Sequence, residues 1–456
     1  MQPRPTPEGV RRASRLTAAA TTLALAAAVL AAAPATATAD GDEVAQAHAR
    51  VETPAAFDDE AGGNANADDP AIWSHPDDHD GDLIVATLKE AGLAVYDTAG
   101  NEIQRIAAPL APRPGDEAGR FNNVDVIYGF RLDGRKVDLA VVSDRGRDTV
   151  RTYVIDPDAA ERHRAPLTDV TDANAAPVFS SSPDEINEQA TAYGLTSWTS
   201  SRGTSYVALS RRHTTRLGLV RLVATAAGTI TYQRVRTLDL PQSFDLPGGG
   251  TWTPCGDPGE GPQVEGMVAD PENEALYAAQ EDVGIWRIPM NGGAPRLIDK
   301  VKSFGVPATY DPLTDECVPS GPDPGAGGEH LTADAEGLTI YRKDNGKGYL
   351  LASSQGDNSF AVYDREDPEE YLGSFRVTPG DTADGSEHSD GAMVTSAPIG
   401  GFRHGLFVVH DGQNTPEAVD ENGELRENTN FKFVDWEDVA DPLDLDVTPG
   451  DWDPRD

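Results

Sequence analysis

The sequence is poor in cysteine, in long apolar segments and in positive charge, and each shortage excludes a class of protein. Only two of its 456 residues are cysteines, so a zinc site built from cysteine thiolates is excluded. After residue 33, no apolar run approaches the ~18 residues of a transmembrane helix, and we expect no membrane partner. The 37 Lys and Arg residues face 76 Asp and Glu residues, for a formal net charge of −39. This charge disfavours nucleic acid and anionic membrane surfaces as partners.

The first 39 residues have the pattern of a secretory signal peptide. Three arginines precede an apolar run over residues 16–33, and the Ala-Thr-Ala of residues 37–39 supplies a small-residue cleavage site. We therefore expect cleavage before Asp40 and a secreted, extracellular protein.

The body of the chain has short apolar runs divided by Gly, Asp, Asn and Pro, without a helical stripe of useful length, which predicts an all-β fold. Pairs of such runs recur at residues 83–87 and 92–96, 137–142 and 150–155, 205–209 and 218–222, 276–279 and 284–288, and 349–352 and 360–363. With a strand at 405–410 in a last unit, the repeats predict a six-bladed β-propeller over residues 68–440. Two stacked sheets, as in a sandwich or jelly roll, are the structural alternative.

Two long segments interrupt the repeat. Residues 243–263 and 303–330 are rich in Pro and Gly, and they contain Cys255 and Cys317 respectively. Because an exported protein meets an oxidising compartment, a disulfide between these two cysteines is predicted. It would tie the two long loops together.

The segments that flank the predicted propeller are acidic and lack an apolar period. We interpret residues 40–67, after the signal peptide, as a flexible acidic lead-in. Residues 441–456 form an acidic C-terminal tail, which is expected to fray.

Acidic residues beside glycine recur at the starts of predicted strands. The four places are Asp68-Asp69 before Pro70, Glu265-Gly266, Asp334-Ala335-Glu336-Gly337, and the run from Asp384 to Asp390-Gly391. Hard oxygen ligands on such backbone suit calcium better than zinc. A single cluster of this kind is more often a solvated turn. Four at equivalent places, gathered at one end of a propeller channel, favour a calcium site.

Basic residues are scarce, and some occupy equivalent positions in successive repeats. Lys89, Arg145 with Arg147, and Arg211 with Arg212 each follow the first strand of a pair. Cations at one rim beside metal-binding carboxylates predict a site for a polyanion, and phosphate suits the arginine fork.

The motifs of other hydrolase classes are incomplete or missing in this sequence. Arg403-His404-Gly405 and His410-Asp411 have the letters of the histidine acid phosphatase motifs, but an apolar strand alone separates them and the following arginine and proline are missing. The sequence also lacks a G-x-S-x-G elbow and an H-E-x-x-H helix, so serine nucleophiles and zinc proteolysis have no visible residues.

Seven short segments, spread in order from about residue 68 to residue 440, form a more specific pattern. They are Asp68-Asp69-Pro70-Ala71-Ile72-Trp73, Gly92-Leu93-Ala94-Val95-Tyr96, Asn122-Asn123-Val124-Asp125, Glu265-Gly266-Met267, Glu336-Gly337-Leu338-Thr339-Ile340-Tyr341, Gly348-Tyr349-Leu350-Leu351-Ala352-Ser353-Ser354-Gln355-Gly356 and Asn430-Phe431-Lys432. Together they resemble the β-propeller phytases, the alkaline, calcium-dependent type of bacteria. The resemblance implies a six-bladed propeller with structural calcium ions and a calcium cluster at one end of the channel.

The resemblance also implies roles for individual residues. Matching positions suggest active-site calcium ligands at Asp68, Asp69, Glu265, Asp334, Glu336 and Asp384, and structural or channel calcium ligands at Asp390, Asp411 and Asn414. The implied phosphate-holding set is Lys89, Arg145, Tyr193 and Arg211, with Glu281 at a neighbouring substrate-affinity site. Two departures concern the second phosphate pocket: Arg211-Arg212 stands where the family has Lys-Glu, and Glu90 where a second lysine often follows Lys89.

The implied reaction is hydrolysis of phosphomonoesters of myo-inositol hexakisphosphate, presented as its calcium complex, by a 3-phytase type of enzyme. A calcium-activated water would attack phosphorus directly, and the implied catalytic set is Asp69, Glu265, Glu336, Asp384, Arg145 and Lys89. The alternatives are a non-catalytic, calcium-stabilised propeller that binds a polyanion or glycan, and a hydrolase of lactones or phosphotriesters. We expect a monomer, because a closed propeller leaves no sheet edge to pair.

Overall fold

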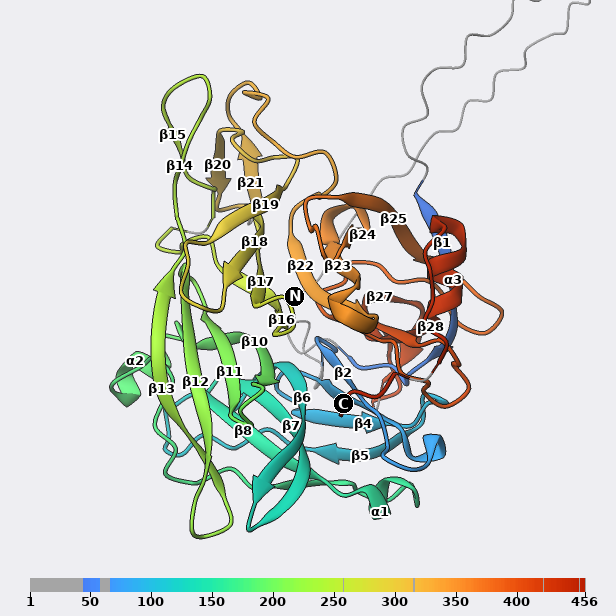
Figure 1. Ribbon diagram of the computed structural model, residues 1–456. Helices are drawn as coiled ribbons and strands as arrows, with labels where there is room; N and C mark the ends of the chain where they lie inside the picture. The colour runs from blue at the N-terminus through green and yellow to red at the C-terminus, as the bar shows by residue number, and fades with distance from the viewer. Residues whose placement is uncertain are drawn as a thin grey trace, which may run out of the picture. The chain divides into compact units, whose positions relative to one another are not determined.

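The computed structural model describes residues 44–57, 66–256, 258–314, 316–420, 422–450 and 452–455. The predicted signal peptide over residues 1–39 lies outside this part. The described chain is all-β, with strands running through most of its length (Figure 1). Within it, no helix is both long enough and apolar enough to cross a membrane.

Four sheets have four strands each, and in every one the strands lie in chain order with antiparallel neighbours. They are β2 (Pro70–Trp73), β3 (Leu83–Thr87), β4 (Leu93–Tyr96) and β5 (Glu102–Ile106); β6 (Phe121–Leu132), β7 (Arg135–Asp144), β8 (Thr149–Ile155) and β9 (Leu167–Asp169); β10 (Ala192–Thr199), β11 (Ser205–Arg211), β12 (Arg216–Ala224) and β13 (Ile230–Asp239); and β16 (Val264–Asp270), β17 (Ala275–Gln280), β18 (Gly284–Pro289) and β19 (Arg296–Lys300). This is a propeller-like arrangement, and it confirms four of the predicted blades.

The remaining main sheet has eight strands. In spatial order they are β22 (Ala335–Arg342), β23 (Gly348–Ser354), β24 (Ser359–Asp364), β25 (Tyr371–Thr378), β1 (Ala45–Glu52), β28 (Leu425–Asp435), β27 (Leu406–Val419) and β26 (Ala392–Thr395). The first half of β1 pairs in parallel with β25, and its second half pairs antiparallel with β28.

Strand β1 overturns part of the prediction for residues 40–67. Instead of a flexible lead-in, Ala45–Glu52 is a strand in which Ala47 and Ala49 are buried while the intervening side chains face outward. Alanine alternating with polar residues is a weak local pattern. The strand forms because β25 and β28, more than 300 residues along the chain, supply hydrogen-bond partners on both of its edges.

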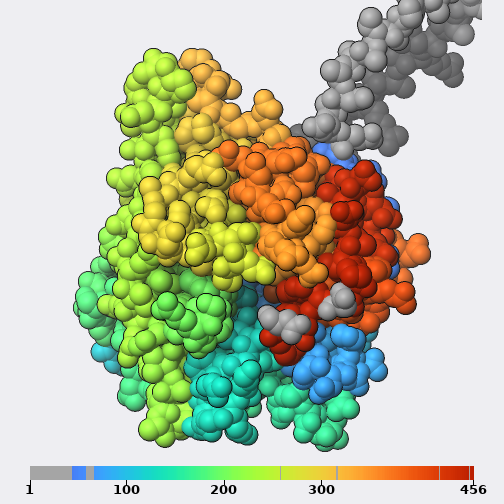
Figure 2. Space-filling model, in the orientation of Figure 1, coloured from blue at the N-terminus to red at the C-terminus, as the bar shows by residue number. Residues whose placement is uncertain are grey.

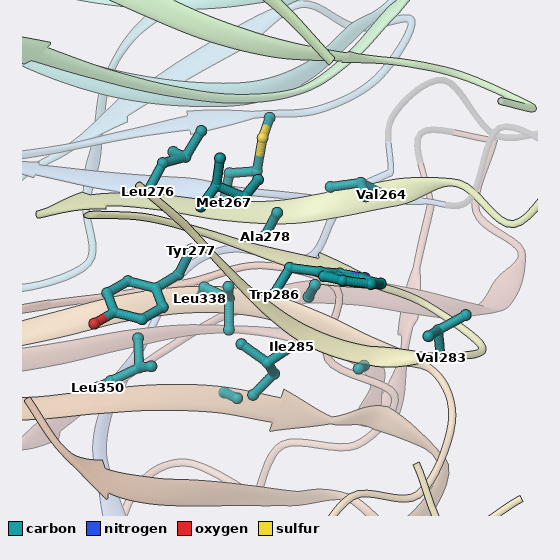
Figure 3. Close-up of a cluster of buried hydrophobic side chains, with 14 of the residues drawn as sticks. Val264, Met267, Leu276, Tyr277, Ala278, Val283, Ile285, Trp286, Leu338 and Leu350 are labelled. Carbon is teal, nitrogen blue, oxygen red and sulfur yellow. The ribbon is translucent and has the colours of Figure 1, made fainter. Parts of the chain in front are cut away.

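We call six strands the inner strands. They are the first strand of each four-stranded sheet (β2, β6, β10 and β16) and the two end strands of the eight-stranded sheet (β22 and β26). Each contacts the next in this order, and β26 contacts β2, so the inner strands form a closed cycle. Apolar side chains fill the space between adjacent sheets, as in the cluster around Trp286 and Met267 (Figure 3). The inner strands therefore hold their ends in fixed positions relative to one another.

The two cysteine-bearing segments form paired projections beside the sheets. They contain the hairpins β14 (Phe244–Asp245) with β15 (Thr251–Trp252) and β20 (Ala308–Asp311) with β21 (Glu316–Pro319). The predicted disulfide between Cys255 and Cys317 is confirmed, with a Cα–Cα separation of 5.9 Å. Figure 2 shows both projections standing out from the surface, and we call them together the arm.

Helices are short and lie in the connections. They are α1 (Pro157–Ala160), α2 (Pro183–Asn187) and α3 (Trp436–Ala440), with 3-10 turns η1 (His79–Gly81), η2 (Asp344–Gly346), η3 (Gln355–Asp357) and η4 (Asp441–Leu443). Helices α1 and α2 begin with proline after a capping Asp156 or Ser182 side chain, which accepts a backbone N–H.

The C-terminal tail is packed, contrary to the prediction that residues 441–456 fray. Among its described residues, the Thr448 N–H donates to the Tyr341 hydroxyl at 3.0 Å. Arg455 Nη2 donates to Asp138 Oδ2 at 2.7 Å, and its guanidinium lies 4.6 Å from the centre of the Tyr128 ring. These partners lie more than 100 residues away in sequence, so composition alone suggested a free tail.

Candidate active site

Several of the candidate site residues lie at the beginnings of the inner strands, where the pairing is irregular. The register shifts between Phe121 and Val124 in β6, Ala192 and Leu195 in β10, Val264 and Met267 in β16, and Ala335 and Leu338 in β22. Such irregularities re-aim a side chain relative to a regular strand. The four register shifts span Asn122, Tyr193, Glu265 and Glu336 respectively, all of them polar residues of the site.

Glycine follows the carboxylate because neighbouring inner strands approach closely at this level. A Cβ atom at Gly266 would overlap the carbonyl oxygen of Glu336, and one at Gly391 would lie 2.6 Å from the Cα of Asp69. The recurring acidic-residue and glycine pattern is therefore a packing requirement. It brings carboxylates from successive sheets together.

Three glutamates form the closest acidic group in the described residues. Glu265, Glu281 and Glu336 each place one carboxylate oxygen within 4.8 Å of the other two. Burial, followed by the charge of Asp334, raises the pKa of Glu281 well above its ordinary value, and burial with Glu265 does the same for Glu336. Like charges at this separation need protons or a cation to stabilise them.

Asp68 and Asp69, immediately before β2, add two further buried carboxylates. Burial raises the pKa of both well above the ordinary range, and Asp68 also interacts electrostatically with Glu265. We call Asp68, Asp69, Glu265, Glu281, Asp334 and Glu336 together the inner-strand group.

The donor set of the inner-strand group fits calcium. Oxygen atoms of Asp68 (Oδ2), Glu281 (Oε1) and Glu336 (Oε2) are buried and accept no hydrogen bond from any described residue. The group offers only carboxylate oxygens, which are the ligands that calcium prefers. A hard divalent cation would satisfy these oxygens and offset their mutual repulsion.

A ring of contacts connects Glu265 of the inner-strand group to the guanidinium of Arg145. Asn122 Nδ2 donates to Glu265 Oε1 at 2.6 Å, and Asn122 Oδ1 accepts from Arg145 Nη1 at 3.1 Å. The Tyr193 hydroxyl donates to Glu265 Oε2, and the Arg145 guanidinium lies 5.7 Å from the centre of the Tyr193 ring. The ring fixes Arg145 relative to Glu265. Asn122, which is fully buried, was quoted in the sequence pattern but not predicted as a site residue.

Lys89 is the second cation at the inner-strand group. Its Nζ lies 3.7 Å from Asp390 Oδ2, and Gln355 Nε2 donates to Asp390 Oδ1 at 2.7 Å. Burial acts to lower the pKa of Lys89, but the charges of Asp68 and Asp390 outweigh it and raise the pKa above its ordinary value. Lys89 is therefore a charged ammonium beside the carboxylates.

The predicted ligands Asp384, Asp411 and Asn414 lie in a different group, built around Lys432. Lys432 Nζ lies 2.8 Å from Glu52 Oε2 and 3.1 Å from Asp411 Oδ2, and it also contacts Asp384 Oδ1. It donates to Asn414 Oδ1 at 2.5 Å, while Asn430 Nδ2 donates to the same oxygen at 2.9 Å. We call these six residues the Lys432 group.

The assignment of Asp384 as an active-site ligand stays a prediction, but the contacts of this residue lie with the Lys432 group. Asp384 Oδ2 accepts hydrogen bonds from the N–H and the hydroxyl of Thr415, both at 2.7 Å, and Oδ1 pairs with Lys432. Lys432 is fully buried, so an internal ammonium already neutralises part of this group. Sequence spacing could not separate the two groups, because the strands that carry them meet only in the fold.

The two adjacent arginines after β11 have different surroundings. Arg211 Nε donates to the carbonyl of Ala190 at 2.7 Å. Arg212 instead interacts electrostatically with Arg145, Tyr193 and Glu265. The sequence prediction named both arginines after this strand and assigned only Arg211 to the phosphate-holding set, on the family resemblance. Asp282 is a further residue that the prediction missed, and burial raises its pKa to about 7.

Two cavities lie along the inner strands. One of about 60 Å³ lies between them and is lined by Asp69, Asn123, Gly266 and Gly337 among others. The other, of about 1640 Å³, lies at their opposite ends and is lined by Tyr128, Trp198, Arg342 and Arg455 among others. Neither lining includes the three glutamates, so the site is a crowded set of charges at one end of the inner strands.

The fold and the site define a class of protein: a propeller-like all-β chain in which buried carboxylates, suited to a hard divalent cation, lie beside cations suited to an anion. The family model described as Phytase matches residues 14–246 and 323–456. The chain therefore belongs to the phytase family. Glu265 and Glu281 lie between the two matched ranges.

A curated relative agrees with this family. The 3-phytase of Bacillus subtilis (strain 168) is 33% identical over 402 residues, which cover 87% of this chain and 86% of the relative. Among solved structures, a luciferin-regenerating enzyme is 10% identical and covers 84% of this chain and 96% of its own, with a TM-score of 0.38. Chaetomium thermophilum Sqt1, solved with the N-terminus of ribosomal protein L10, is 12% identical and covers 85% of this chain and 100% of its own, with a TM-score of 0.41. We base no argument on these two structural likenesses.

Proposed function

We propose that this protein is a secreted, calcium-dependent phytase. It would hydrolyse phosphomonoesters of myo-inositol hexakisphosphate, taken as the calcium complex, to lower inositol phosphates and inorganic phosphate. The observation that carries the proposal is the inner-strand group itself: buried carboxylate oxygens without donors lie beside Lys89 and Arg145, in a chain of the phytase family.

Calcium ions would be held by Glu265, Glu281 and Glu336 together with Asp68, Asp69 and Asp334. When bound, they would polarise a water molecule and screen the negative charge of the phosphate. The carboxylates at this place would be engaged by the metal ions, so we propose direct attack of water on phosphorus.

Lys89 and Arg145 would bind the oxygens of the phosphoryl group. Both are partly buried cations, where charge is less screened than in bulk water. Arg145 is held in place by Asn122, and the Tyr193 hydroxyl holds Glu265 from the other side. The chain thus fixes the phosphate-binding cation and the metal-binding carboxylate in one hydrogen-bonded unit.

We assign the Lys432 group a structural role. Glu52 lies on β1, Asp411 and Asn414 on β27, and Lys432 on β28, so their contacts join the first strand of the described chain to the last. Asp384, from the preceding loop, contacts the same ammonium.

The blade count that we propose is six. The eight-stranded sheet would count as two blades, β22–β25 and β26–β28 with β1, joined where β1 pairs with both β25 and β28. The closed cycle of six inner strands supports this count. A ring closed in this way has no free inner edge, which supports the expectation of a monomer.

Export is proposed from the pattern of residues 1–39 and from the disulfide of the arm. The signal peptide would be removed before Asp40, and the secreted chain would act on calcium phytate outside the cell.

The test is phosphate release from inositol hexakisphosphate by the chain that begins at Asp40, near neutral pH, with calcium and then with excess EDTA. We expect release with calcium, loss of release in EDTA, and recovery when calcium is restored. Full activity in EDTA would contradict the metal assignment. No release in either condition, together with a calcium-dependent Tm, would contradict the enzymatic function and favour a propeller that only binds a polyanion.

A further inference from the structure

The first projection of the arm is closed at its base by one buried amide. Gln280 Nε2 donates to the carbonyl of Pro241 at 3.2 Å and to the carbonyl of Pro262 at 2.8 Å. These two prolines lie before and after the hairpin of β14 and β15. The Trp286 indole N–H donates to Gln280 Oε1 at 2.9 Å, and Gln280 is fully buried. The base of the projection is therefore fixed one residue before Glu281.

The chain that returns from this projection is held against the turn after β11. The Gly261 N–H donates to the carbonyl of His213 at 2.9 Å. The His213 N–H in turn donates to Gln263 Oε1 at 2.8 Å. The oxygen of the Gln263 side chain is therefore fixed by the backbone of the neighbouring sheet.

The nitrogen of the same side-chain amide holds Glu281 of the inner-strand group. Gln263 Nε2 donates to Glu281 Oε2 at 3.0 Å, and the Glu281 N–H donates to the Gln263 carbonyl at 3.2 Å. The Ala335 N–H donates to the Glu281 carbonyl at 2.9 Å, so the backbone of Glu281 is held from two sides. Glu281 Oε1 is buried and accepts no hydrogen bond from any described residue. Gln263 thus fixes one carboxylate oxygen of Glu281 and leaves the other for a cation.

The chemistry of this partner suits a metal ligand. In the Lys432 group, an ammonium holds the carboxylates and neutralises part of their charge. The amide of Gln263 is uncharged, so it orients Glu281 without neutralising it. The full negative charge of the carboxylate then remains available to a hard cation.

We propose that Gln263 is a positioning residue for calcium binding: it orients the Glu281 carboxylate, and so couples the base of the arm to the calcium affinity of the inner-strand group. The proposal rests on the proposed function, which supplies the calcium. Hydrogen-bond partners that orient a metal ligand contribute about 10- to 100-fold to metal affinity.

The experiment measures calcium binding by titration calorimetry, after bound calcium has been removed with a chelator and the chelator dialysed away. Gln263→Met and Gln263→Asn are compared with the unmodified protein. Methionine is unbranched but does not donate a hydrogen bond, and asparagine keeps the amide on a side chain one methylene shorter. Gln233→Met is the matched control, because Gln233 is exposed on β13 and accepts from Arg221. Phosphate release against calcium concentration and Tm in EDTA are measured on the same four proteins.

We expect Gln263→Met to raise the Kd for calcium by about 10-fold or more. The calcium concentration for half-maximal phosphate release should rise by a similar factor, and excess calcium should restore most of the activity by mass action. Gln263→Asn should change both values less, because it keeps the amide but cannot reach His213 and Glu281 together. Tm in EDTA should change little more than in Gln233→Met. If Gln263→Met fails to fold, Gln263→Asn provides the same comparison.

Equal calcium affinity in Gln263→Met and Gln233→Met would overturn the proposal. A loss of activity that excess calcium does not restore would overturn it too, because that loss indicates a purely structural role. The outcome is separable from that of the proposed function. A protein that releases no phosphate, yet binds calcium in a Gln263-dependent way, would retain the positioning role and lose the enzymatic assignment. Absence of calcium binding by the unmodified protein would overturn both.

Discussion

The inner-strand group and the Lys432 group contain the same kinds of residue, but they differ in what neutralises them. In the Lys432 group, a buried ammonium contacts oxygens of Glu52, Asp384 and Asp411. In the inner-strand group, oxygens of Glu281 and Glu336 have no donor among the described residues. Acidic composition alone therefore does not distinguish a structural cluster from a binding site. The two groups differ in direct contact: Lys432 lies against the oxygens of its group, whereas Lys89 pairs with Asp390 and leaves oxygens of Glu281 and Glu336 without a donor.

The largest effect should come from removing a carboxylate of the inner-strand group. Glu265→Ala deletes an oxygen donor and the anchor of Asn122 and Tyr193. We expect phosphate release to fall by at least about 100-fold, the scale of losing one transition-state contact. Glu102→Ala, on the exposed strand β5, is the control and should keep full activity. Equal losses in the two variants would contradict the site.

The Lys432 group should instead respond in stability. Lys432→Met leaves three carboxylates without their ammonium, and breaking a buried pair in this way costs about 3–5 kcal/mol. Urea unfolding in EDTA should show this loss of unfolding free energy. If the midpoint is unchanged while activity disappears, the two groups have been assigned to the wrong roles.

A smaller effect should come from Asn122, which positions Arg145 relative to Glu265. Asn122→Ala removes both contacts and leaves the charged groups in place, so we expect activity to fall by about 10-fold, as for other outer-shell partners. The calcium concentration for half-maximal activity should rise as well, a change that a purely structural role would not produce. Asn101→Ala, in a surface turn, is the control, and similar values for the two variants would remove Asn122 from the site.

The sequence predicted the repeating strand pairs, the disulfide and most residues of the inner-strand group, because each depends on local patterns. The Glu-Gly pairs were recognisable since one short stretch holds both the carboxylate and the glycine that lets the next strand approach. Lys89 and Arg145 followed from their equivalent positions after a strand. These features need only a few neighbouring residues to be seen.

The errors concern residues whose partners lie far away in the chain. Strand β1 depends on β25 and β28, and the tail depends on Tyr341 and Asp138. Nothing in the segment of Asp384 shows that Lys432 lies against it, and its role as an active-site ligand stays a prediction.

Strand β1 also imposes an order on the folding of the chain. It precedes every other described strand in the sequence, yet its two neighbours, β25 and β28, are among the last to be synthesised. Strand β1 can therefore pair only after β25 and β28 have been synthesised. Its pairing joins residues far apart in the sequence and so has a very high contact order. Sheets such as β2–β5 and β6–β9 can form while the chain emerges, but the seam between its beginning and its end can be completed only when synthesis has reached Asp435. A chain stopped before that point would lack the same seam as a chain cut after β1.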